Sequence, residues 1–160
     1  MATHGCLDYR GGMRIPPPVL ALTAALVQRV LTRGAPPPSA VRTAASVATA
    51  AVSGLIASAA ARQFTRAGTT LDPSDPTRVS VLVTTGANSV TRNPMYVGLS
   101  GLLLAYAIRR GSWTALLPVA AFVVVIDRLQ ILSEEAALSA QFGIYYEDYR
   151  QRVPRWLGPI

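Results

Sequence analysis

Histidine, cysteine and lysine are almost absent from this sequence. It has one histidine, His4, one cysteine, Cys6, and no lysine, since all 15 basic residues are arginine. A single cysteine excludes an internal disulfide framework and a cysteine-based zinc cluster. Because the one histidine lies near the N-terminus, we expect neither a histidine base nor a metal site.

Charged residues are also scarce. They make up 14% of the chain, against about a quarter in an average soluble domain, and the mean hydropathy is +0.34. This composition indicates a membrane protein. The net charge of +7 would suggest a nucleic-acid partner for a soluble protein, but here we assign the arginines to helix ends that face anionic headgroups. We expect a lipid bilayer and no nucleic acid as a partner.

The chain contains four long apolar runs. With short extensions to Asn93 and Leu132, the last two reach the length of about 17 residues that a spanning helix needs. We therefore predict an all-α, polytopic membrane protein with about four transmembrane helices. A cleaved signal peptide for the first run, or a soluble protein with a buried hairpin, are the alternatives. The runs cover Pro16–Leu31, Val41–Ala61, Met95–Ile108 and Trp113–Ile126.

The predicted organisation is a single membrane domain, residues 1–160. An N-terminal helical hairpin covers residues 1–61, and Ser39 is a candidate N-cap for its second helix. A cytoplasmic loop covers 62–92. A cofactor-binding helical hairpin with an amphipathic C-terminal segment covers 93–160, and Gly143 should divide that segment into two short helices.

The arginine distribution sets the predicted orientation. With four crossings, ten arginines lie on the side of Arg92 and the C-terminal segment, and five lie on the other side. The positive-inside rule therefore places both termini and the long loop in the cytoplasm. Arg92 and the pair Glu134-Glu135 would then meet on one side of the membrane.

Acidic residues at the end of the fourth run are the first candidates for chemistry. Carboxylates at the end of a membrane helix are costly unless compensated, so Glu134 and Glu135 mark a functional site unless both are solvated. In a regular α-helix Asp127 and Glu134 share a face, while Glu135 lies about 100° away. One glutamate can then pair with Arg92 or Arg128 while the other faces a cavity.

Residues at the start of the third run are the second candidates. Arg92-Asn93-Pro94 is compatible with a simple helix start. Gly98 and Gly101 provide either close helix packing or room for a ligand.

The C-terminal segment is rich in aromatic residues, which could form a belt at the membrane interface or a wall around a bound cation. They are Tyr145, Tyr146, Tyr149 and Trp156.

As an ordered set, these motifs resemble the integral-membrane methyltransferases, a family that includes isoprenylcysteine carboxyl methyltransferases and phospholipid N-methyltransferases. The resemblance covers roughly residues 62–157. Its motifs are Arg92-Asn93-Pro94-Met95-Tyr96-x-Gly98, Glu134-Glu135-x-x-Leu138, Phe142-Gly143-x-x-Tyr146-x-x-Tyr149 and Val153-Pro154-Arg155.

The resemblance implies an S-adenosylmethionine site on the cytoplasmic side and methyl transfer to a lipophilic or membrane-associated acceptor. Arg92 and Glu135 are the expected catalytic residues. The chain departs from the family at Gly86-Ala87-Asn88-Ser89, where members often have Gly-Pro-Tyr-Arg, and at Asn93, where many carry histidine. The residues expected to bind the cofactor are Asn93, Tyr96, Gly98, Glu134, Glu135, Tyr149, Arg152, Pro154 and Arg155.

The chemical class of the methyl acceptor can be inferred only from the bases that the sequence offers. Methyl transfer from a sulfonium is an in-line displacement that the protein mainly positions and desolvates. An amine acceptor must first lose a proton, and only Glu134 or Glu135 is a candidate base. A carboxylate or thiol, with Arg92 anchoring an anion, is therefore favoured over an amine. A nicotinamide-dependent membrane reductase and a non-catalytic oligomeric membrane module are the competing interpretations.

Overall fold

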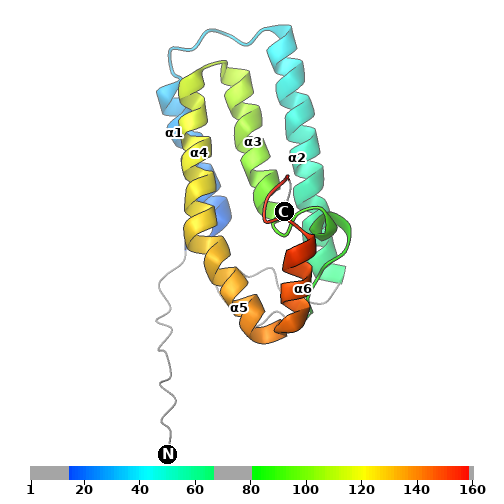
Figure 1. Cartoon of the computed structure of the whole chain (residues 1–160). Helices are drawn as coiled ribbons and strands as arrows, with labels where there is room; N and C mark the ends of the chain where they lie inside the picture. The colour runs from blue at the N-terminus through cyan, green and yellow to red at the C-terminus, as the bar shows by residue number, and fades with distance from the viewer. Residues whose placement is uncertain (1–14, 67–80, 159–160) are drawn as a thin grey trace, which may run out of the picture.

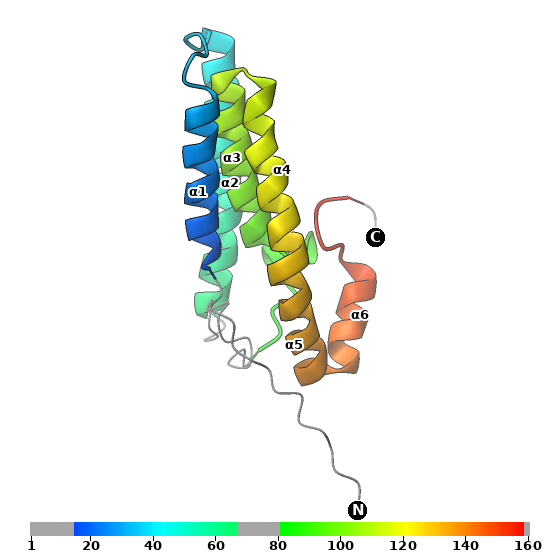
Figure 2. The same ribbon diagram turned by 90° about the vertical axis from the view of Figure 1, so that its left-hand side faces the viewer.

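The computed structural model describes residues 15–66 and 81–158, and all regular structure within them is helical. The predicted all-α class is confirmed for these residues, while residues 67–80 of the predicted loop and both chain ends lie outside them. Four helices run side by side and alternate in direction (Figure 1, Figure 2). They are α1 (Pro17–Leu31), α2 (Ala40–Arg66), α3 (Pro94–Arg110) and α4 (Leu116–Val125).

Prolines, a serine and a glycine delimit these helices. Pro17 and Pro94 occupy the first helical positions of α1 and α3, where a missing N–H is tolerated. Ser39 Oγ accepts a hydrogen bond from the backbone N–H of Arg42 (3.3 Å), which confirms its predicted N-cap role. α3 ends at Gly111, whose φ of 61° is left-handed.

The fourth helix and the helical stretch predicted after it form one continuous rod. A π-helical turn at Ile126–Ile131 follows α4, and α5 (Leu132–Phe142) extends the same rod beyond the bundle (Figure 2). The extension to Leu132 is therefore confirmed, and the helix expected between Ser133 and Gly143 follows it without a break. Gly143 (φ 53°, ψ −125°) then reverses the chain into α6 (Ile144–Arg152), as predicted.

The most extensive helix contact joins α2 and α3, and it depends on small residues. Gly98 and Gly101 of α3 face Ser53 and Ala57 of α2. A Cβ atom on Gly98 would lie 2.7 Å from the Cβ of Ala57 and 2.9 Å from the backbone oxygen of Ser53. At these two glycines the structure therefore shows close helix packing.

The distribution of apolar side chains suits a bilayer. Outer faces expose large apolar residues such as Leu22 (65%) and Leu129 (71%). Two helices, Ala40–Arg66 and Trp113–Phe142, are long and apolar enough to cross a membrane, and only 17% and 33% of their apolar windows are buried. A core helix of a soluble protein would be mostly buried, so these helices indicate a membrane protein. The count of four crossings stays a prediction, because α1 and α3 have only 15 and 17 residues.

Candidate functional site

The candidate site lies at one end of the bundle, where the N-terminal end of α3 meets α5 and α6 (Figure 1). Arg92 lies two residues before the start of α3 at Pro94, and Glu135 lies on α5. Arg92 Nη2 and Glu135 Oε1 are 3.2 Å apart, and each side chain is only 10% exposed. The two polar ends of the hairpin therefore meet, and the pairing of one glutamate with Arg92 is confirmed.

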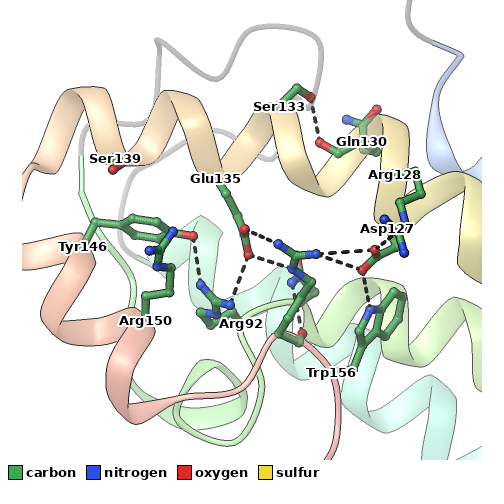
Figure 3. Close-up of polar contacts among 12 residues, drawn as sticks. Arg92, Asp127, Arg128, Gln130, Ser133, Glu135, Ser139, Tyr146, Arg150 and Trp156 are labelled. Carbon is green, nitrogen blue, oxygen red and sulfur yellow. Dashed lines mark hydrogen bonds and ion pairs between the residues drawn. The ribbon is translucent and has the colours of Figure 1, made fainter. Parts of the chain in front are cut away.

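A second arginine, from the C-terminal segment, also holds Glu135. Arg155 donates from Nε to Oε1 (3.1 Å) and from Nη2 to Oε2 (2.6 Å), which is the bidentate fork of guanidinium on carboxylate. Hydrogen bonding to Glu135 raises the pKa of Arg155 above its usual value. A buried carboxylate is costly unless it is paired, and here two guanidinium groups compensate it (Figure 3).

Asp127 contacts the same arginine as Glu135. Arg155 Nη1 lies 3.3 and 3.4 Å from the two carboxylate oxygens of Asp127, and Trp156 Nε1 donates to Oδ1 at 2.8 Å (Figure 3). The prediction that Asp127 shares a helix face with Glu134 is therefore wrong. Hydrogen bonds in the intervening π-helical turn reach one residue further than in an α-helix, so Glu135 takes the position that Glu134 would have had.

Glu134 has a different set of partners. Its Oε1 accepts hydrogen bonds from Tyr96 OH (2.6 Å) and from Gln130 Nε2 (2.7 Å). Tyr96 lies on α3 and Gln130 in the π-helical turn, so Glu134 links two helices of the site. The adjacent glutamates thus differ in their surroundings, because neutral donors bind Glu134 and arginines bind Glu135.

Three hydrogen bonds to backbone oxygens of the C-terminal segment fasten it to the start of α3. The N–H of Arg92 donates to the backbone oxygen of Pro154 at 2.9 Å. Thr91 Oγ1 and Asn93 Nδ2 donate to the backbone oxygen of Arg155 at 2.9 and 3.0 Å. These three bonds fix the relative positions of the two arginines that bind Glu135.

Two buried tyrosines of α6 border the site. Tyr146 OH accepts a hydrogen bond from Arg92 Nη1 (3.4 Å), and Tyr149 OH donates to the backbone oxygen of Asn88 (2.6 Å). Burial raises the pKa of Tyr146 to about 12, with the charge of Glu135 adding to the effect, and burial also raises the pKa of Tyr149. Both phenols are therefore protonated at neutral pH.

The segment that departs from the methyltransferase pattern packs between two helices. Gly86–Ser89 forms a 3₁₀ turn, and Asn88 within it is only 2% exposed. Asn88 Nδ2 donates to Gln63 Oε1 of α2 (3.4 Å), while its backbone oxygen accepts the bond from Tyr149 of α6. Asn88 therefore connects α2 to α6 at the edge of the site.

The site surrounds a cavity of about 340 Å³, a size within the range of about 300–1,000 Å³ that is usual for small-molecule sites. The start of α1, Phe64, Val81–Val83, Leu99 and Leu138 form its apolar walls. Six of the predicted site residues supply its polar lining, namely Arg92, Asn93, Tyr96, Glu134, Glu135 and Tyr149.

Four predicted cofactor residues lie elsewhere. Gly98 is in the contact with α2, and Arg152 is exposed and donates from Nε to the backbone oxygen of Asp148 (3.0 Å). Pro154 and Arg155 support the cavity from behind its lining, through the bonds to Arg92 and Glu135. The roles of all these residues toward a cofactor stay predictions.

The lining also contains residues that were not among the predicted site residues, and Tyr146, Leu138 and Asn88 are three of them. Tyr146 and Leu138 belong to the motifs quoted above, so the sequence did carry a signal for them. Asn88 had no such signal, because it lies where the chain departs from the pattern, and its position depends on Gln63 and Tyr149.

Comparison with known proteins gives two matches. A family model described as phospholipid methyltransferase matches residues 41–145. An uncharacterized protein of Haemophilus influenzae is 43% identical over 63 residues, which are 39% of this chain and 100% of that protein. No solved structure matches.

Proposed function

The chain belongs to the phospholipid methyltransferase family, which implies membrane methyltransferase activity, and we propose that it transfers a methyl group from S-adenosylmethionine to a lipophilic or membrane-associated acceptor. The observation that carries this proposal is the cavity, which has a charged end at Arg92, Glu134 and Glu135 and apolar walls elsewhere. A charged end suits the zwitterionic amino-acid portion of the cofactor, and apolar walls suit an acceptor with a hydrocarbon chain.

The residues at the charged end fit the amino-acid portion of this cofactor. Arg92 Nε is buried and has no hydrogen-bond partner in the described part of the chain, so it is a donor suited to a carboxylate. Glu134 and Glu135 supply negative charge for an ammonium group, and Tyr149 can present a ring face to a sulfonium. The bound cofactor would supply an electrophilic methyl group, while these residues orient it and exclude water.

The same lining favours an acceptor that is already deprotonated. Glu135 is paired with two arginines, Glu134 accepts bonds from Tyr96 and Gln130, and Tyr146 is protonated at neutral pH. Of these groups only Glu134 is left as a candidate base for an amine, and its Oε1 is already bound by two donors. We therefore favour a carboxylate or thiolate on an apolar chain, such as an isoprenylcysteine-like carboxylate or a small thiol, over a lipid amine.

The proposed topology has four crossings with the site in the cytoplasm. The ten-to-five division of arginines supports this orientation, and the alternating directions of α1 to α4 are compatible with it (Figure 1). A reporter fused after Ile160 should be active only in the cytoplasm. A reporter on the opposite side of the membrane would overturn the orientation.

Binding of S-adenosylmethionine to detergent-purified protein tests the proposed function. Wild type should bind saturably, and Glu135→Gln should bind at least about tenfold more weakly, because it leaves two partly buried arginines without their shared carboxylate. Asp148→Asn, an equivalent change at an exposed position of α6, is the matched control.

Three outcomes discriminate between the candidate functions. Folded wild type that binds neither S-adenosylmethionine nor S-adenosylhomocysteine would refute the methyltransferase proposal. Binding of a nicotinamide cofactor instead would identify a reductase, and no binding of either kind would indicate a non-catalytic module. If the methyl donor binds, transfer of labelled methyl to carboxylate, thiol or amine acceptors identifies the acceptor class.

A further inference from the structure

Asp127 lies outside the cavity lining but is part of the charged network behind it. Arg155 Nη1 and Trp156 Nε1 donate hydrogen bonds to its carboxylate, and Arg128 Nε lies 3.5 Å from Oδ2. Arg128 is 74% exposed, whereas Asp127 is only 18% exposed. Solvent therefore screens Arg128 strongly, and the main charged partner of Asp127 is Arg155.

The charges around Glu135 show why an acid is needed at this position. Two arginines, Arg92 and Arg155, contact the single carboxylate of Glu135. With Glu134, which also lines the cavity, these two arginines and two glutamates only balance one another in charge. Asp127 adds one negative charge on the far side of Arg155, so the wall as a whole is negative and favours a cation.

Geometry gives Asp127 a second role. A guanidinium group is planar, and its donors are fixed in direction. With Nη1 held by Asp127, the remaining fork of Arg155, Nε and Nη2, is directed at Glu135. The bond from Trp156 and the π-helical turn in turn fix Asp127.

We propose that Asp127 is a positioning residue of the cavity: through Arg155 it orients Glu135 and keeps the charge of the wall low enough to accept a cationic ligand. This inference rests on the proposed function, since S-adenosylmethionine carries a net positive charge and S-adenosylhomocysteine carries none. Asp127 itself touches neither ligand.

The test compares the affinities of these two ligands in Asp127→Asn. Asparagine has the same shape and can still accept the bond from Trp156, so the main change is the loss of one negative charge. We expect the affinity for S-adenosylmethionine to fall on the order of tenfold more than the affinity for S-adenosylhomocysteine. A purely structural defect would weaken both ligands equally and leave their ratio unchanged.

A second variant makes the charge argument falsifiable even if the first is poorly stable. Asp127→Asn combined with Arg155→Gln removes one charge of each sign, so the affinity ratio should return toward the wild-type value even if both affinities are reduced. Asp148→Asn, which removes an exposed acid, should leave the ratio unchanged.

Each result has a separate meaning. If wild type binds neither ligand, the proposed function fails. If wild type binds both but Asp127→Asn keeps the wild-type ratio, or if the double variant keeps the altered ratio of the single one, the role assigned to Asp127 is refuted while the cofactor site stands.

Discussion

Substitution of Gly98 by alanine tests whether this glycine serves helix packing or ligand binding. The added Cβ would lie 2.7 Å from the Cβ of Ala57, 2.9 Å from the backbone oxygen of Ser53 and 3.1 Å from the backbone nitrogen of Ala57. Backbone atoms cannot rotate away, and ordinary contact begins near 3.4 Å, so α2 and α3 must separate by at least about 0.7 Å. Overpacking of this kind destabilises by about 1–3 kcal/mol.

The expected result is a lower unfolding temperature. For a chain of this length, 1 kcal/mol corresponds to about 2–4 °C, so Gly98→Ala should unfold several degrees below the wild type in the same detergent. Gly101→Ala should also lower the unfolding temperature, because the added Cβ would lie 2.9 Å from the Cβ of Ser53 and would meet the Ser53 hydroxyl, which can rotate only by giving up its hydrogen bond to the backbone oxygen of Thr49. Gly54→Ala is the matched control, since nothing lies within 4 Å of its added Cβ and alanine is the better helix former.

Ligand binding measured on the same variants separates the two roles. If Gly98→Ala keeps the wild-type unfolding temperature but loses affinity for S-adenosylmethionine, the glycine makes room for a ligand. If Gly98→Ala, Gly101→Ala and Gly54→Ala all unfold at the same temperature, the close approach of α2 and α3 does not constrain the helices. The packing argument then fails.

Three further predictions concern α6 and its surroundings. Burial raises the pKa of Tyr146 to about 12, from an ordinary value of 10.0, so the unfolded chain loses the phenol proton at a lower pH than the folded chain. The free energy of unfolding should therefore fall as pH rises from 10 toward 12. Thermal unfolding at each pH should show a less steep fall in Tyr146→Phe. Gly143→Ala should destabilise by about 1–3 kcal/mol through backbone strain at φ 53°, since no neighbour lies within 4 Å of the added Cβ; unchanged thermal unfolding would contradict this. Tyr149→Phe should cost about 1–3 kcal/mol in chemical denaturation, because the backbone oxygen of Asn88 loses its buried donor; an unchanged midpoint would argue against this contact.

Local patterns predicted the helices well because helix formation there depends on local residues. Each apolar run is helical, and Gly111 and Gly143 end helices at the positive φ that glycine tolerates. The π-helical turn and the unbroken continuation of the rod through it to Phe142 were not predictable in this way. Both depend on partners remote in sequence, such as Arg155 on Asp127 and Tyr96 on Glu134.

The same distinction applies to the candidate site. Glu134 and Glu135 attract notice from sequence alone, since acids next to an apolar run are unusual. Asp127 was noticed for the same reason, but its partner could not be identified. A regular α-helix would place Asp127 on the same face as Glu134, whereas in the structure it shares Arg155 with Glu135. Asn88 is polar and short, like many loop residues, and only its bonds to two helices distinguish it.

The π-helical turn has a consequence for tracing the ancestry of this segment. Asp127 and Glu135 lie eight residues apart and reach one arginine, whereas a regular α-helix brings residues to the same side at a spacing of seven. The rod therefore holds one residue more than the contact requires, and deletion of the exposed Leu129 would be the simplest way to remove it. A homologue with a regular helix should carry the two acids seven apart, so a correct alignment would open a one-residue gap between them. In such a comparison an insertion, rather than a substitution, would be the change that separates the two proteins.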